Sequence, residues 1–210
     1  MAQGLSTNSY AVLGMLALRP WTPYELTQQF LRSLTWCWPV SERQLYTEPE
    51  RLVAAGLAQV KTTGNGSRAR REYSIKPAGR KALKEWLATP TSAPRIFNEP
   101  LLRVLYADQG DKDDLLQALV GLREELLERF ETGRARSVEY LEGTGPFPER
   151  AHLVAMFADL GQRLTSVIDE WAADSIREVS SWSSTRDLGL TEATKQTLAR
   201  VVDAAHPATT

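Results

Sequence analysis

The pattern of apolar and polar residues predicts two helices in quick succession at the start of the chain. In the first, apolar residues at positions 12, 13, 16 and 17 share one face, and Asn8 or Ser6 can cap its N-terminus. The second begins with a capping box, since Thr22 offers a hydroxyl and Glu25 a reciprocal carboxylate three residues later. Pro23 at the first helical position strengthens that start, and the helix is expected to end near residue 34.

A third helix is expected after a break at residues 36–39, where two tryptophans and a proline flank a cysteine. Ser41 and Gln44 form its capping box, and Gly56 ends it. Its inward-facing residues are Leu45, Leu52 and Val53.

A β-hairpin and a fourth helix follow. Residues 57–63 and 68–75 have strand character, and the intervening Gly-Asn-Gly-Ser turn tolerates positive φ. Pro77 opens a helix whose expected packing residues are Ala82, Leu83, Trp86 and Leu87. Residues 91–98 are proline-containing and without periodicity, which indicates a linker between a domain at 1–90 and a second at 99–210.

The second domain is expected to be helical throughout. The predicted helices are Pro100–Asp108, an Asp111-capped helix over Leu115–Tyr140, Glu149–Trp182 and Thr191–Ala204. The expected fold is therefore mainly α with one small two-stranded wing.

An apolar stripe with alternating spacings of four and three runs along the third of these helices. Its members are Leu153, Phe157, Leu160, Leu164, Val167 and Trp171. Such a stripe pairs with another helix, either the preceding one in the same chain or the same helix of a second copy. Separately, Met156, Phe157, Trp171 and Trp182 are candidates for an aromatic effector pocket, although an aromatic stripe at helical spacing also fits plain core.

Charge divides the chain at the linker. The net charge is only -1, but residues 1–90 carry 12 Lys or Arg against 6 Asp or Glu, and the remainder carries 13 against 20. The resulting +6 and −7 favour a phosphate-binding module attached to an acidic body. The alternative is two ordinary surfaces that differ by chance.

Other classes of function find little support. The chain lacks a nucleophile elbow, a phosphate loop and a dinucleotide fingerprint, so no enzyme is expected. His152 and His206 are too few for a metal cluster, and no cofactor is expected. Cys37 lies between indoles that raise a thiol pKa, which disfavours redox sensing. The apolar run at residues 10–18 is too short to span a bilayer and has no basic residue before it, so a cytoplasmic protein is expected.

Several separated sequence blocks occur in order within residues 9–88. They are Ala11–Leu16, Tyr24–Leu26, Leu45-Tyr46 with Arg51-Leu52, Ala55–Leu57, Arg68–Tyr73 and Ala78–Arg80. These blocks resemble the PadR family of bacterial transcriptional regulators. The resemblance implies a winged helix-turn-helix repressor that dimerises through C-terminal helices. It also implies release of the operator when a small, commonly aromatic, molecule binds.

The chain departs from the family pattern in two places. Thr22-Pro23 replaces the usual His-Gly, which fits a helix start. Thr47 replaces the proline after Leu45-Tyr46, and Pro49 follows two residues later. Since Pro49 cannot donate to the Leu45 carbonyl, the third helix should be kinked or broken there.

The candidate DNA-binding residues lie at the start of the third helix and on the hairpin. They are Ser41, Arg43, Gln44, Tyr46, Thr47, Lys61, Asn65, Arg68, Arg70 and Arg71. Arginine pairs with guanine and glutamine with adenine through two hydrogen bonds, so Arg43 is the foremost candidate for base reading. The alternative is a solvated arginine that pairs with Glu50 or another carboxylate. Tyr46 suits either a phosphate contact or half-buried packing. The hairpin arginines suit the DNA backbone or a narrow minor groove. The alternative is a charged hairpin edge that prevents strand pairing with other proteins.

A double-stranded palindromic operator, bound by a homodimer with sites about one helical turn apart, is the expected partner. The alternative is a winged-helix module that contacts proteins.

Overall fold

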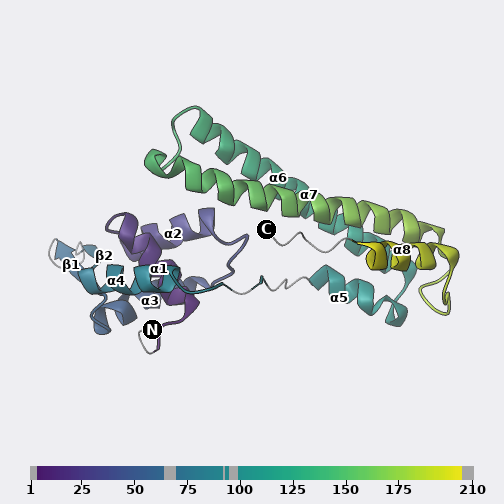
Figure 1. Ribbon diagram of the computed structural model, residues 1–210, viewed down its shortest axis with the longest axis horizontal. Coiled ribbons are helices and arrows are strands. Elements are labelled where there is room, and N and C mark those ends of the chain that lie inside the picture. The colour runs from purple at the N-terminus through teal and green to yellow at the C-terminus, as the bar shows by residue number, and fades with distance from the viewer. Residues whose placement is uncertain (1–3, 64–69, 92, 95–98, 205–210) are drawn as a thin grey trace. The chain divides into compact units, whose positions relative to one another are not determined.

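The structure is a computed structural model that describes residues 4–63, 70–91, 93–94 and 99–204 (Figure 1). The chain divides into two compact units, residues 1–94 and residues 95–210. Both are mainly helical, and the described residues form one antiparallel two-stranded sheet, in the first unit. The prediction of a mainly α fold with a small β-hairpin is confirmed.

The first unit consists of three helices, a hairpin and a fourth helix. These are α1 Thr7–Leu18, α2 Pro23–Ser33, α3 Glu42–Ala54, β1 Ala58–Thr63, β2 Arg70–Ile75 and α4 Pro77–Leu87. The two predicted capping boxes are present at the starts of α2 and α3. The first helix also has one, in which Ser6, and not Asn8, is the cap.

The core of this unit lies between α1, α2, α3 and the hairpin. Its largest buried side chains are Leu13, Leu16, Leu26, Phe30, Leu45, Leu52 and Tyr73. The strands pair antiparallel from Ala58 opposite Ile75 to Thr63 opposite Arg70. Trp21 extends this sheet, because its backbone exchanges two hydrogen bonds with Tyr73, at 3.0 and 2.8 Å. The segment before α2 is thereby attached to the hairpin.

Of the two outcomes expected at Pro49, a kink or a break of α3, the break does not occur. The helix is continuous from Glu42 to Ala54 with Pro49 inside it. Pro49 is buried, and Leu45 and Leu52 hold the turns on either side of it in the core. Packing of both halves therefore outweighs the hydrogen bond that the Leu45 carbonyl loses.

Helix α4 packs through fewer residues than expected. Ala82 is buried and Trp86 stacks on Tyr10 with ring centroids 4.9 Å apart, but Leu87 is exposed, contrary to the prediction. Gly79 is required for close approach, since a Cβ there would lie 2.2 Å from the Leu57 carbonyl oxygen. The helix can lie against the start of the hairpin because this residue has no side chain.

The second unit is built on a pair of long helices. Its elements are α5 Glu99–Leu105, the short 3-10 helix η2 Ala107–Gln109, α6 Lys112–Leu141, the 3-10 turn η3 Pro148–Arg150, α7 Ala151–Ser181 and α8 Glu192–Asp203. Helices α6 and α7 pack against each other (Figure 1). Asp111 occupies the N-cap position of α6 with an extended backbone, but its side chain makes no capping hydrogen bond, which corrects its expected role.

The buried core of this pair comes from one face of each helix. Leu115, Leu119 and Leu126 of α6 are buried, as are Ala172 and Val179 of α7. The chain after α7 is held to the segment between α5 and α6, since Arg186 Nε donates to the Asp108 carbonyl at 2.7 Å. None of the helices within the described ranges is long and apolar enough to cross a membrane.

Candidate nucleic-acid interface

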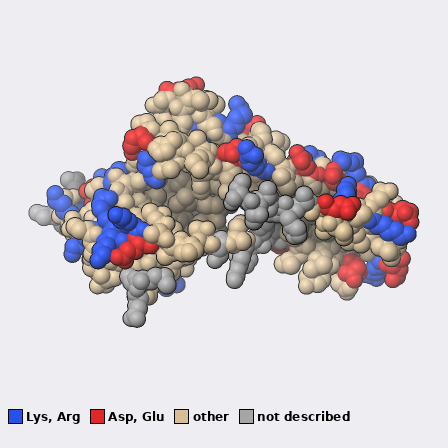
Figure 2. Space-filling view, in the orientation of Figure 1, with Lys and Arg blue, Asp and Glu red and all other residues tan. Residues whose placement is uncertain are grey.

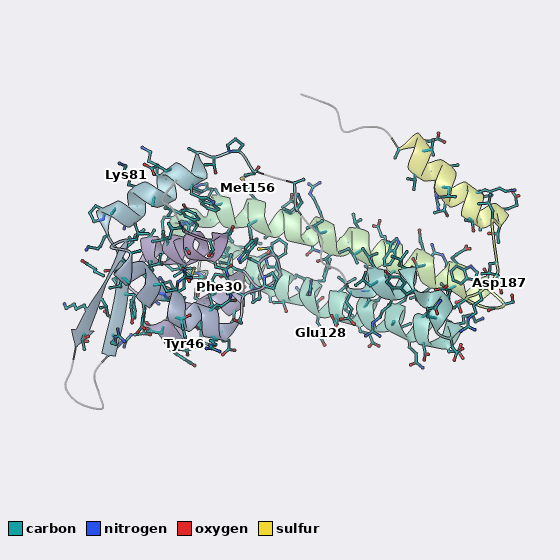
Figure 3. All side chains as sticks on the ribbon, turned by 90° about the horizontal axis from the view of Figure 1, so that it is seen from below. Phe30, Tyr46, Lys81, Glu128, Met156 and Asp187 are labelled. Carbon is teal, nitrogen blue, oxygen red and sulfur yellow. The ribbon has the colours of Figure 1, made fainter. Side chains whose placement is uncertain are left out.

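The start of α3 is an exposed surface over a buried base. Residues 41–44, 46 and 47 are exposed, whereas Leu45, Glu48 and Pro49 face the core. Figure 3 shows Tyr46 on the outer side of the unit and Phe30 in its interior. The exposed residues share one side of the helix because a repeat of 3.6 residues per turn separates them from the core positions.

Ser41 and Gln44 are engaged in the helix cap. The Ser41 hydroxyl oxygen accepts from the Gln44 backbone N–H at 3.3 Å, and Gln44 Oε1 accepts from the Ser41 backbone N–H at 3.3 Å. Two-pronged pairing of glutamine with adenine needs both the side-chain oxygen and the nitrogen. Gln44 can therefore read adenine in that way only by releasing its part of the cap.

The Arg43 side chain has no hydrogen-bond or ion-pair partner among the residues that the structure describes. Glu50, the partner expected if Arg43 were a solvated surface residue, pairs with Arg71 instead. Tyr46 is 42% exposed, so it is not held in the core. The Thr47 hydroxyl donates to the Arg43 carbonyl at 3.0 Å and so follows the helix backbone. Arg43 and Tyr46 are the two predicted α3 residues whose side chains reach outward.

Glu48 anchors α3 to α1 and was not among the residues predicted from the sequence. It is 5% exposed, and its Oε1 accepts from the Ser9 hydroxyl at 2.6 Å while Oε2 accepts from Arg51 at 2.8 Å. Ser9 lies in the first turn of α1, where the helix dipole favours a negative charge. The helical repeat placed Glu48 between the inward Leu45 and Leu52, so its position on the core side could have been recognised.

The hairpin carries the second group of candidates. Lys61 is exposed on β1, and Arg70 and Arg71 are half exposed at the start of β2. Figure 2 shows Lys and Arg gathered at the end of the first unit that carries the hairpin, with acidic residues beside them. Asn65 and Arg68 lie outside the described residues.

Both described hairpin arginines are paired with carboxylates. Arg70 Nη2 donates to Glu25 Oε1 at 2.8 Å, and its Nε lies 3.3 Å from Glu72. Arg71 Nη1 donates to Glu50 Oε1 at 2.8 Å, and its guanidinium lies 5.5 Å from the centre of the Tyr73 ring. These partners come from α2, α3 and β2, so the arginines link the hairpin to the helices beside it.

These pairs and burial shift several pKa values. The pKa of Glu25 is lowered, first by the hydrogen bond from the Thr22 backbone and further by the nearby Arg70 charge. Burial raises the pKa of Tyr73, and the adjacent Glu50 carboxylate adds to that shift. Burial also raises the pKa of the Cys37 thiol, in the direction predicted, so the thiolate is disfavoured. Nearby, Trp38 Nε1 donates to Asn8 at 2.7 Å and attaches this turn to α1.

Most of the apolar stripe of α7 is left exposed, although Trp171 packs against the buried cluster that α6 and α7 share. Leu153, Leu160, Leu164 and Val167 are exposed, and Phe157 and Trp171 are partly exposed. The face of α7 that packs on α6 instead includes Ala172 and Val179. Among the described residues, pairing within the chain therefore leaves most of this stripe uncovered.

The four residues predicted to line an effector pocket are not brought together. Met156 is 74% exposed, whereas Trp171 and Trp182 pack against the buried cluster of Leu115, Leu119 and Val179. Met156 and Trp171 are 15 residues apart on one helix, which separates them by about 22 Å. A groove of about 510 Å³ between α6 and α7 is lined by other residues, with Arg123 and Asp169 paired at 2.7 Å among them.

The first unit has three consecutive helices, the third with an exposed polar start, followed by a basic hairpin. Together with the helical second unit, this order of elements defines a winged helix-turn-helix protein with a helical C-terminal unit. Residues 12–85 match the profile of the transcriptional regulator PadR-like family. This part of the chain is a PadR-like domain, and the predicted resemblance is confirmed.

The chain is 26% identical over 98 residues to the negative transcriptional regulator PadR of Bacillus subtilis. That match covers 46% of this chain and 54% of the relative, so it spans about half the length of the curated protein.

Solved structures extend the similarity of fold to most of the chain. B. subtilis PadR in complex with operator DNA matches with a TM-score of 0.68 at 18% identity, covering 83% of this chain and 99% of that one. The same protein in complex with p-coumaric acid matches with a TM-score of 0.64 at 17% identity, covering 84% and 100%. The PadR-like regulator BC1756 of Bacillus cereus gives 0.70 at 17% identity, covering 85% and 99%.

Proposed function

We propose that this protein is a sequence-specific DNA-binding transcriptional regulator. The observation that carries the proposal is the exposed start of α3 beside a basic hairpin in a PadR-like domain, where the Arg43 side chain has no partner among the described residues. A helix of this kind fits the major groove, where arginine reads guanine, and a hairpin with arginines suits the phosphate backbone. The structural relative B. subtilis PadR has been solved in complex with operator DNA, which supports DNA binding by this fold.

Selection from a random pool of DNA duplexes tests this proposal. The full-length protein should enrich a defined sequence, which is then compared with its scrambled version by fluorescence anisotropy over a range of salt concentrations. Arg43→Ala should reduce the preference for the enriched duplex. Arg70→Ala should weaken binding to both duplexes and lower the salt slope by roughly 1.

Arg163→Ala, in the acidic second unit, serves as the control and should leave binding unchanged. Failure to retain any duplex at low salt would contradict DNA binding and favour a protein-contact role for the winged-helix domain.

The proposed regulator acts as a homodimer through the exposed stripe of α7. An apolar stripe along a 31-residue helix, left uncovered by α6, needs a partner surface, and a second copy supplies an identical one. Two copies would place two α3 helices on a palindromic operator.

Light scattering after gel filtration should therefore give a dimer mass for the wild type and a monomer mass for Leu160→Glu. Leu141→Glu, at an exposed position off the stripe, should remain dimeric. A monomeric wild type at micromolar concentration would contradict this part of the proposal.

We further propose that the protein represses transcription and releases DNA when a small aromatic molecule binds. The support comes from the B. subtilis relative, a negative regulator that has been solved with p-coumaric acid. Titration of p-coumarate into the protein bound to its enriched duplex should lower the anisotropy. If p-coumarate and a panel of related aromatic acids leave the anisotropy unchanged, the proposed effector class is wrong.

A further inference from the structure

The strands of the hairpin are held from two sides, at their ends next to the turn, by carboxylates of the helix-turn-helix. Successive residues of a strand point to opposite faces, so Arg70 and Arg71 leave β2 in different directions. Arg70 reaches Glu25 on α2 and Arg71 reaches Glu50 on α3, each with a donor to acceptor distance of 2.8 Å. The hairpin is therefore attached to both helices through its own basic residues.

Each carboxylate is itself fixed on a rigid element. Glu25 Oε2 accepts from the backbone N–H and the hydroxyl of Thr22, at 3.0 and 2.9 Å, which leaves Oε1 for Arg70. Glu50 Oε1 also lies 3.4 Å from the hydroxyl of Tyr73, a residue whose backbone is bonded to Trp21 in the sheet. Anchors of this kind restrict where the two guanidinium groups can point.

The pairs leave donors for a further anion. A guanidinium carries five N–H groups in a fixed plane. Glu25 and Glu72 engage two nitrogens of Arg70, and Glu50 engages one nitrogen of Arg71. Each arginine can therefore keep its carboxylate on one edge and bind a phosphate with the remaining N–H groups.

The stability of the ion pairs does not explain why these two carboxylates meet the hairpin arginines. Glu25 stabilises α2 through its capping box, but both ion pairs are partly exposed, and exposed pairs contribute little to folding. Both carboxylates also put negative charge on the part of the unit that would approach DNA, where it opposes attraction to phosphates. What the two ion pairs do is orient the arginines, and with them the hairpin relative to α3.

We propose that Glu25 and Glu50 are positioning residues for sequence recognition, which set the hairpin at a fixed angle to α3 so that phosphate contacts and the Arg43 base contact occur in one register. This inference rests on the proposed DNA-binding function. According to this inference, two acidic residues favour the binding of DNA, a polyanion, because they hold the arginines that contact it.

The inference predicts an effect opposite in sign to simple electrostatics. Removal of a negative charge strengthens attraction to any duplex, whereas loss of positioning weakens discrimination between sequences. Glu25→Gln and Glu50→Gln remove the charge, and glutamine can still serve in the capping box at position 25. Glu42→Gln is the matched control, since Glu42 is an exposed carboxylate in the first turn of α3 with no partner among the described residues.

The experiment measures the affinity of the full-length protein for the duplex most enriched by the wild type and for its scrambled version, at one salt concentration. The ratio of the two affinities should fall by about 3-fold to 10-fold in Glu25→Gln and Glu50→Gln, because the base contact is partly lost. Their affinity for the scrambled duplex should be unchanged or higher. Glu42→Gln should keep the ratio within about 2-fold, a change too small to represent a lost base contact. Far-UV circular dichroism and thermal melting establish that the variants are folded.

A double-mutant cycle separates positioning from a general structural role. In an Arg71→Gln background, Glu50→Gln should have no further effect on the ratio, because Glu50 acts through Arg71. The inference is overturned if Glu50→Gln changes the affinities for the two duplexes equally, as is expected of Glu42→Gln. It is also overturned if Glu50→Gln still lowers the ratio in the Arg71→Gln background. If the wild type itself enriches no duplex, the proposed function fails first and this inference with it.

Discussion

Replacement of Glu48 should destabilise the first unit, because this buried carboxylate joins α3 to α1. Glu48→Ala removes the acceptor of the Ser9 hydroxyl, which donates at 2.6 Å from a fully buried residue. A hydrogen bond to a charged group contributes about 1.5 to 3 kcal/mol. The ion pair with Arg51 is exposed on the arginine side and adds at most about 1 kcal/mol. The expected loss is therefore about 2 to 4 kcal/mol.

Glu48→Gln separates the two contributions. The amide keeps an oxygen that can accept from Ser9 but loses the charge that faces Arg51, so a loss of about 1 kcal/mol is expected. Urea unfolding of the full-length protein, followed by far-UV circular dichroism, gives the free energy of unfolding for each variant. If Glu48→Ala lies within about 0.5 kcal/mol of the wild type, a range typical of surface substitutions, the anchoring role is refuted.

Three further predictions concern packing, an unsatisfied hydroxyl and pH. Gly79→Ala should cost about 1 to 3 kcal/mol in urea unfolding, because its Cβ would lie 2.2 Å from the Leu57 carbonyl oxygen; an unchanged midpoint would contradict this contact. Thr27→Val should stabilise the protein by up to about 1 kcal/mol in the same assay, since the Thr27 hydroxyl is buried without a hydrogen-bond partner among the described residues. In the second unit, the hydrogen bond and charge of Arg123 lower the pKa of Asp169 below its usual 3.8, so the stability from this pair is present above that pH and is lost as pH falls below it. The melting temperature of Asp169→Asn should accordingly be lower than that of the wild type at neutral pH and equal to it at strongly acidic pH. If the difference in melting temperature is the same at every pH, the ion pair is not its cause.

The helix starts and the hairpin followed from local sequence. Ser41 with Gln44 and Thr22 with Glu25 lie three residues apart, so each capping box depends only on residues within one helical turn. The strands were recognisable for a similar reason, because a turn rich in glycine separates two segments of strand character. Local rules failed at Pro49, where core packing on both sides keeps α3 continuous.

The candidate site was only partly predictable. Arg43 and Tyr46 follow from their place on α3, because the helical repeat separates exposed from buried positions. Gln44 was expected to read bases, yet its side chain engages the cap, since the same oxygen serves both roles. The exposed stripe of α7 was visible as a pattern, but the sequence left open whether α6 would cover it.

The sequence by itself determined which segments are helix or strand, where most of them begin, and that one basic unit precedes an acidic one. Only the tertiary structure decided which side chains meet. Arg70 and Glu25 are 45 residues apart, and Ser9 and Glu48 are 39 residues apart. The physical reason is that capping and periodicity act within a turn of backbone, whereas these pairs depend on how helices and hairpin pack around a shared core.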